Sequence, residues 1–137
     1  ATDTWIADEN TVARIIEETG GFGADFTFEA TGLVGVMAQA VEAARIGWGV
    51  CCVTGVAGKG ETLDIVPRFL ITGRKVMGAS FGGVKGRTQV PGLVDRYLAG
   101  DIDVGSFISH RISLENVNEG FDLMHKQDGI RSVIEFA

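Results

Sequence analysis

The chain has 137 residues, enough for one compact domain or part of one, and its 45% hydrophobic and 22% charged residues fit a globular rather than a disordered protein. A formal net charge of -6 without any Lys/Arg cluster argues against nucleic-acid or anionic-membrane binding, because both need a basic face. No run approaches the roughly 20 apolar residues of a membrane span, and the first residues show no signal-peptide pattern.

The first two thirds of the chain alternate helix and strand patterns that are joined by short glycine-containing turns. The spacing of apolar residues predicts helices over 11–19, from Val34 up to Gly47 and from Pro67 up to Gly73, and strands over 25–30, 49–54 and 75–81. The run at 49–54 is apolar on both faces, which is typical of a central parallel strand covered by helices. This alternation predicts an α/β fold with a parallel sheet.

The last third has a different pattern. Pro91 is predicted to open a helix that ends at Gly100, and residues 107–112 are predicted to be extended. Ser113 is a candidate cap for a following helix that runs to Met124, and residues 130–136 form a predicted final strand.

The chain offers few residues for metal binding or catalysis. Cys51 and Cys52 are adjacent within an apolar run, which suits neither a disulfide framework nor a tetrahedral zinc site. We interpret them as small buried residues in a reducing, cytoplasmic setting. His110 and His125 stand alone, without the paired Cys/His spacing that zinc needs. We therefore expect no metal ligand and no catalytic residue in this chain.

Seven short strings, taken together and in this order, resemble the zinc-containing medium-chain alcohol dehydrogenases. They are Phe28–Gly32, Gly47–Val50, Thr54–Val56, Thr72–Arg74, Phe81–Lys85, Val90-Pro91 and Ile130–Val133. The Trp48 and Lys85 segments are most similar to class III, the glutathione-dependent formaldehyde dehydrogenases.

The resemblance implies the second, nicotinamide-side half of a Rossmann-type parallel sheet, followed by C-terminal helices and a strand that return to the catalytic domain. Residues 1–83 would form the partial NAD-binding domain, and residues 84–137 the C-terminal segment of the catalytic domain. The Gly-rich turn at the pyrophosphate and the Cys and His ligands of the catalytic zinc do not occur in this sequence. We therefore expect the C-terminal portion of a longer enzyme, inactive on its own.

The same resemblance implies which residues contact NAD. Ala30 and Thr31 would flank the adenosine, and Arg131 would bind the pyrophosphate. The remaining implied contacts surround the nicotinamide: the backbone carbonyls of Thr54 and Ala79, the backbone N–H of Phe81, and the chain at Gly55, Val56 and Ser80.

The expected activity is hydride transfer to NAD from a primary alcohol or from a hydroxymethyl–thiol adduct, with zinc ligands outside this chain. Ile46 stands where class III relatives place a lysine that helps to hold glutathione. An adduct of a different thiol, or a plain alcohol, therefore stays open as the substrate. In dimeric relatives the strand corresponding to 75–81 pairs with its twofold mate, which implies a homodimer. A non-catalytic nucleotide-binding or oligomerisation module is the alternative.

Overall fold

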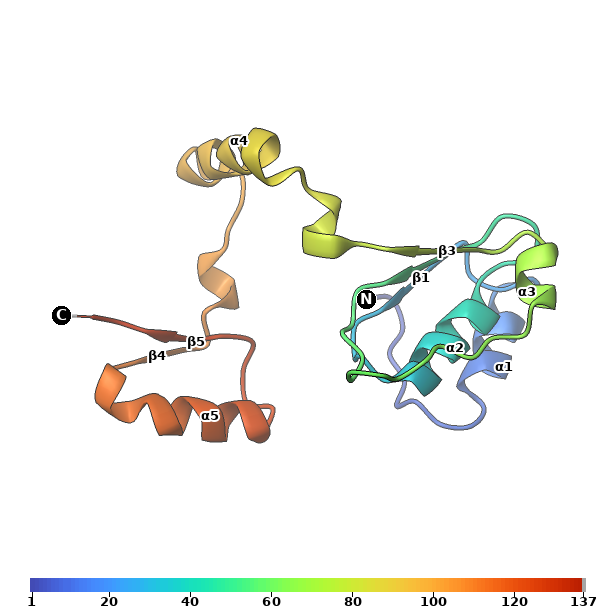
Figure 1. The fold of residues 1–137 in the computed structure, drawn as a ribbon, viewed down its shortest axis with the longest axis horizontal. Helices are drawn as coiled ribbons and strands as arrows, with labels where there is room; N and C mark the ends of the chain where they lie inside the picture. Colours follow the sequence, from blue (N-terminus) through green and yellow to red (C-terminus); the bar gives the residue numbers. More distant parts are fainter. Residues whose placement is uncertain (137) are drawn as a thin grey trace. The chain divides into compact units, whose positions relative to one another are not determined.

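A three-stranded parallel sheet organises the first of two units in the chain. The structure, a computed structural model, describes residues 1–136, and the units are Ala1–Val84 and Lys85–Ala137. In the first unit, β1 (Phe26–Glu29), β2 (Val50–Val53) and β3 (Lys75–Gly78) lie in the order β1-β2-β3, all parallel (Figure 1). The α/β prediction with a parallel sheet is confirmed.

The helices of this unit begin within one residue of the predicted starts, but the second and third end earlier than predicted. They are α1 (Thr11–Glu18), α2 (Val34–Ala43) and α3 (Arg68–Ile71). α1 ends at Glu18, and Gly20, with a φ of 71°, directs the chain away from the helix. The Gly21 N–H then donates to the Ile16 carbonyl at 2.8 Å and the Gly20 N–H to the Glu17 carbonyl at 3.1 Å, so two carbonyls at the helix end are satisfied.

The small core of the first unit lies between α2 and β2. Val41, Ala44 and Cys51 are fully buried, and partly buried Val53 and Phe69 pack against them. Arg74 is also buried, and its Nε donates to the Ala44 carbonyl at 2.6 Å. Burial raises the pKa of the Cys51 thiol, which agrees with its interpretation as a buried apolar residue.

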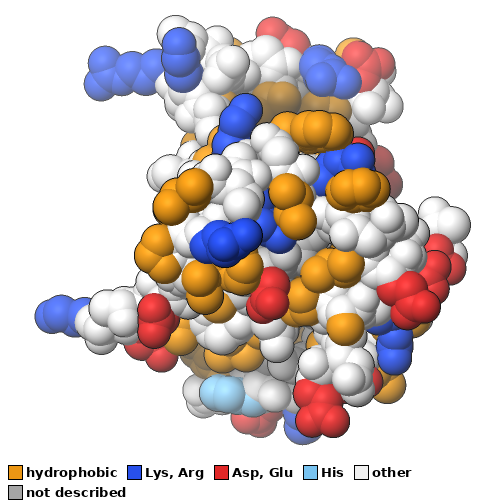
Figure 2. Space-filling view, turned by 90° about the vertical axis from the view of Figure 1, so that its right-hand side faces the viewer, with side chains coloured by type: hydrophobic (Ala, Val, Ile, Leu, Met, Phe, Trp, Pro, Cys, Tyr) orange, Lys and Arg blue, Asp and Glu red, His pale blue; other side chains and the backbone are white. Residues whose placement is uncertain are grey.

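In the space-filling view of Figure 2, apolar side chains are spread among charged ones. The aromatic side chains of Phe26 and Phe28 on the edge strand β1 are 66% and 72% exposed. None of the described helices is long and apolar enough to cross a membrane.

The second unit contains a two-stranded parallel sheet and its helices. β4 (His110–Ile112) pairs with β5 (Ser132–Ile134), and α5 (Val117–His125) follows the short turn η3 (Leu114–Asn116). Ser113 precedes that turn but makes no side-chain capping bond. The predicted extended stretch 107–112 is shorter than expected, since η2 (Gly105–Phe107) occupies its start.

The predicted start of the preceding helix is wrong. α4 spans Gly86–Leu98, so Pro91 lies inside it rather than at its beginning. No Ser, Thr, Asp or Asn marks this start in the sequence; instead, the backbone N–H of Lys85 donates to the Gln89 side chain at 2.7 Å. Because Pro91 has no N–H, α4 lacks the hydrogen bond that this residue would otherwise give to the Arg87 carbonyl.

Candidate cofactor site at the carboxyl ends of the strands

The three parallel strands of the first unit end at the same edge of the sheet. Glu29 on β1 pairs in register with Val53 on β2, which pairs with Gly78 on β3. The next residues along the chain are Ala30, Thr54 and Ala79, three of the predicted cofactor contacts. In open α/β sheets ligands bind outside this edge, so the structure brings the candidate residues together where a nucleotide is expected.

The turn after β1 is built around a buried carboxylate that sequence reasoning did not single out. Glu29 is only 1% exposed. Its Oε1 accepts hydrogen bonds from the Thr31 N–H at 2.5 Å, the Thr31 hydroxyl at 2.6 Å and the Gly32 N–H at 2.9 Å. The Thr31 hydroxyl bond is the main cause of a lowered pKa for Glu29, against which burial acts in the opposite direction. The side chain is therefore an ionised acceptor inside the turn.

The turn after β2 lies directly against the first. The Thr54 N–H and hydroxyl donate to the Glu29 carbonyl at 2.8 and 2.7 Å, and the Gly55 N–H donates to the same oxygen at 3.1 Å. A Cβ on Gly55 would lie 2.6 Å from Glu29 Oε2, so only glycine fits this approach. Val56 follows and is 91% exposed, which leaves a β-branched side chain free to contact a ligand.

The chain after β3 leaves the extended conformation earlier than predicted. The strand ends at Gly78, and Ser80–Gly83 form the turn η1. Phe81 has a φ of 52° and a ψ of 38°, a left-handed conformation that is uncommon for a residue with a side chain. Its aromatic ring is 74% exposed. The Ala79 carbonyl accepts a hydrogen bond from the Gly82 N–H at 3.0 Å, and a second lone pair remains for a ligand.

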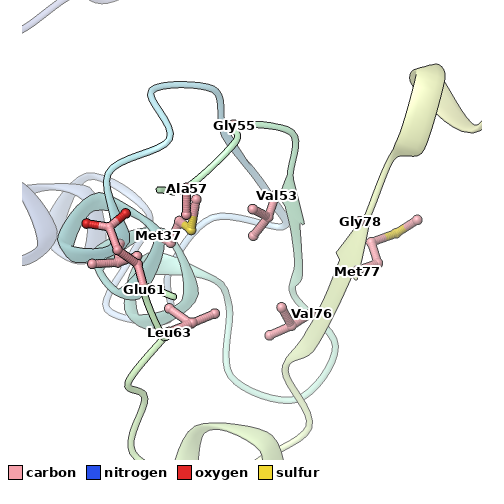
Figure 3. Close-up of a pocket in the computed structure, with 10 residues that line it drawn as sticks. Met37, Val53, Gly55, Ala57, Glu61, Leu63, Val76, Met77 and Gly78 are labelled. Atoms are coloured by element: carbon pink, nitrogen blue, oxygen red, sulfur yellow. The ribbon is translucent and has the colours of Figure 1, made fainter. Parts of the chain in front are cut away.

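A groove of about 410 Å³ opens beside these turns, between α2, the loop after β2, and β3. In Figure 3 the side chains of Val53 and Val76 point toward Leu63, whereas Met77 points to the other side of β3. Glu61 is the one charged group of the lining, and its Oε2 accepts from the Gly58 N–H at 2.6 Å. The groove is therefore an apolar surface, suited to packing rather than to acid–base chemistry.

Metal ligands do not gather anywhere in residues 1–136: no three His, Cys, Asp or Glu side chains lie close enough to hold an ion. His110 in the second unit contacts Asp128, with 3.1 Å from its Nε2 to the carbonyl oxygen and 3.7 Å to the carboxylate.

Arg131, the predicted pyrophosphate ligand, belongs to the second unit. Its carbonyl accepts from the N–H groups of Ser109 and His110 at 2.9 and 3.2 Å, which fixes its backbone just before β5. The side chain is exposed and lies at the rim of a cavity of about 380 Å³ in that unit. The structure thus leaves the guanidinium accessible to an anion.

The family of the chain follows from a match between residues 1–99 and the model of the zinc-binding dehydrogenases. The chain belongs to this family. It is 46% identical over 125 residues to the S-(hydroxymethyl)glutathione dehydrogenase of Synechocystis and 48% identical over 126 residues to that of Candida maltosa. These alignments cover 91% and 92% of the chain but 34% and 33% of the two relatives, so the chain spans about a third of their length.

Solved structures give the same result for the fold. The benzyl alcohol dehydrogenase of Acinetobacter calcoaceticus superposes with a TM-score of 0.80 at 25% identity, over 94% of this chain and 35% of that one. The 2R,3R-butanediol dehydrogenase of Bacillus subtilis superposes with a TM-score of 0.72 at 26% identity, over 95% of this chain and 36% of that one. The predicted family and the Rossmann-type fold class are confirmed.

Proposed function

We propose that this chain is the NAD-binding and C-terminal part of a zinc-dependent dehydrogenase that transfers hydride from a primary alcohol or a hydroxymethyl–thiol adduct to NAD. The observation that carries the proposal is the alignment of three parallel strand ends, with Ala30, Thr54 and Ala79 at one edge, in a member of the zinc-binding dehydrogenase family. Bound NAD supplies the hydride acceptor. The residues of this chain hold and orient it.

The two ends of the cofactor would meet different turns. Ala30 and Thr31 would flank the adenosine, and Arg131 would pair with the pyrophosphate through its guanidinium. The carbonyls of Thr54 and Ala79 would accept from the nicotinamide carboxamide amine. The remaining proposed contacts are Gly55, Val56, Ser80 and Phe81.

The geometry of the β2 turn supports the nicotinamide assignment. Gly55 lets this turn pack tightly against the turn after β1, and the exposed Val56 that follows it can press on one face of the nicotinamide ring. A β-branched side chain has few rotamers, so it would hold the nicotinamide in one orientation and exclude water from that face.

We also propose domain roles for the two units. The first, with its parallel sheet, would be the partial Rossmann domain of residues 1–83, and residues 84–137 would complete the catalytic domain. The ligands of the catalytic zinc would come from outside this chain, because the residues described here do not assemble a metal site.

The substrate is proposed by class. Both of the curated relatives described above are named for S-(hydroxymethyl)glutathione, which supports an adduct of formaldehyde with a thiol. Ile46 is 47% exposed and carries no charge for a glutathione carboxylate. We therefore propose a primary alcohol or a hydroxymethyl–thiol adduct as the substrate, without a requirement for glutathione as the thiol. We also propose that the enzyme acts in the cytoplasm.

A homodimer through β3 is part of the same proposal. β3 is an edge strand of the described sheet, and its Val76 and Met77 side chains are 37% and 53% exposed. Antiparallel pairing with β3 of a second copy would satisfy this open edge.

The test is a fluorescence titration with NADH, on the 137-residue chain and on the full-length polypeptide that contains it, followed by alcohol oxidation assays with and without zinc. We expect NADH binding by the full-length protein and zinc-dependent oxidation. NADH binding without any oxidation would favour the non-catalytic module. Absence of NADH binding at millimolar concentration, or robust oxidation by the 137-residue chain alone, would refute the proposal.

A further inference from the structure

Glu29 is a buried charge that forms no ion pair with any described residue, at the point where β1 meets the candidate site. A carboxylate placed in such a position is costly unless hydrogen bonds replace its water. One oxygen, Oε1, accepts all three bonds from Thr31 and Gly32. The side chain thus fixes the turn that follows β1.

The main chain of the same residue fixes the other turn. The Glu29 carbonyl accepts from the Thr54 N–H, the Thr54 hydroxyl and the Gly55 N–H. One residue therefore holds the adenosine-side turn with its side chain and the nicotinamide-side turn with its backbone.

The second carboxylate oxygen strengthens this link by steric contact. Oε2 is buried and accepts no hydrogen bond of normal geometry from the described residues, although the nearby Gly55 N–H also lowers the pKa of Glu29. It lies so close to the Gly55 backbone that a Cβ on Gly55 would come within 2.6 Å of it. In addition, a Cβ on Gly32 would lie 2.5 Å from the Val56 carbonyl oxygen, so the two turns are in direct contact.

We propose that Glu29 is a positioning residue for the dinucleotide, which fixes the offset between the Thr31–Gly32 turn and the Gly55–Val56 turn so that both can contact one NAD molecule at the same time. This inference rests on the proposed function. Glu29 itself does not touch the reacting atoms.

The proposal predicts a specific pattern of ligand affinities in Glu29→Gln of the full-length protein. Glutamine keeps the size of the side chain, but its amide nitrogen would place two N–H donors where Oε2 has no polar partner. AMP and reduced nicotinamide mononucleotide each use one turn, whereas NADH uses both. We expect NADH to bind about tenfold or more weakly, and each half-ligand to change by less than about threefold, because only the linked ligand depends on the offset.

Val41→Ala is the matched control. Val41 is fully buried in the core of the same unit, so its truncation lowers stability without touching either turn. We expect all three ligands to bind this variant with nearly unchanged affinity once it is folded. If Glu29→Gln fails to fold, Thr54→Val tests the same link, because it removes only the hydrogen bond from the Thr54 hydroxyl to the Glu29 carbonyl. We expect this variant to lose NADH affinity by a smaller factor than Glu29→Gln, again with little change for each half-ligand.

Hydrogen exchange supplies a readout that does not depend on ligand. The Thr31 and Gly32 amides donate to the Glu29 carboxylate, and a neutral glutamine amide accepts these bonds more weakly, so both amides should exchange faster in Glu29→Gln while amides within α2 keep their protection. Equal weakening of all three ligands, or unchanged NADH affinity, would overturn the positioning role alone. If the unsubstituted full-length protein binds no NADH, the proposed function and this inference both fail.

Discussion

Replacing Gly55 with alanine is the sharpest test of the close contact between the two turns. The new Cβ would lie 2.6 Å from Glu29 Oε2 and closer still to the Gly32 amide nitrogen, while real Cβ contacts begin at 3.0 Å. The Gly32 backbone cannot rotate away as a flexible side chain would. We therefore expect a loss of about 1–3 kcal/mol in the free energy of unfolding, the usual range for overpacking.

The assay is urea unfolding followed by NADH titration of the folded variant. Because the turns must separate to admit the methyl group, NADH affinity should fall together with stability. Gly35→Ala is the control, since a Cβ on this exposed residue of α2 meets nothing within 4 Å. That change should be neutral or stabilising by up to about 1 kcal/mol. Equal unfolding midpoints and NADH affinities for the two variants would refute the close contact described for Gly55.

Three further outcomes are expected. The pKa of Glu29 in the folded protein lies below its ordinary value of 4.5, so the ionised side chain stabilises the fold above about pH 4.5. This stabilisation is lost as the pH falls through the pKa of Glu29 in the folded protein. In an acid titration of the free energy of unfolding, Glu29→Gln should therefore lose less stability than the unsubstituted protein. Arg131→Gln should weaken NADH binding about tenfold or more, whereas Arg111→Gln, which removes a pair with Glu135 in the same unit, should not. Met77→Lys on the open edge of β3 should shift sedimentation from dimer to monomer, and a dimer that persists would contradict pairing through β3.

Much of the fold could be predicted from the sequence because local and global signals agree in the first unit. The apolar runs of β1 and β2 and the glycines after each helix mark elements that the structure confirms. The common edge of the strands then followed from parallel pairing alone. Whether the residues at that edge bind NAD stays a prediction.

The misses have physical causes. Glu29 occupies a strand end within a family-like string, and a single charge there gives no sign that it is buried until the turn folds around it. Phe81 was predicted to continue a strand because a left-handed conformation is expected of glycine, not of an aromatic residue. Proline usually occupies the first turn of a helix, which led to the wrong predicted start at Pro91. α4 instead starts at Gly86 and tolerates the absence of a backbone N–H at Pro91.

The tight fit of Gly32 against the Val56 carbonyl, and of Gly55 against the Gly32 amide, bears on any attempt to redesign coenzyme preference. Exchanging residues after β1 to suit a different ribose or base would also displace the backbone after β2. Under the proposed NAD contacts, altering one loop alone would also shift the backbone of the other, and with it the position of the other half of the coenzyme. The two loops therefore need to be redesigned as a single unit.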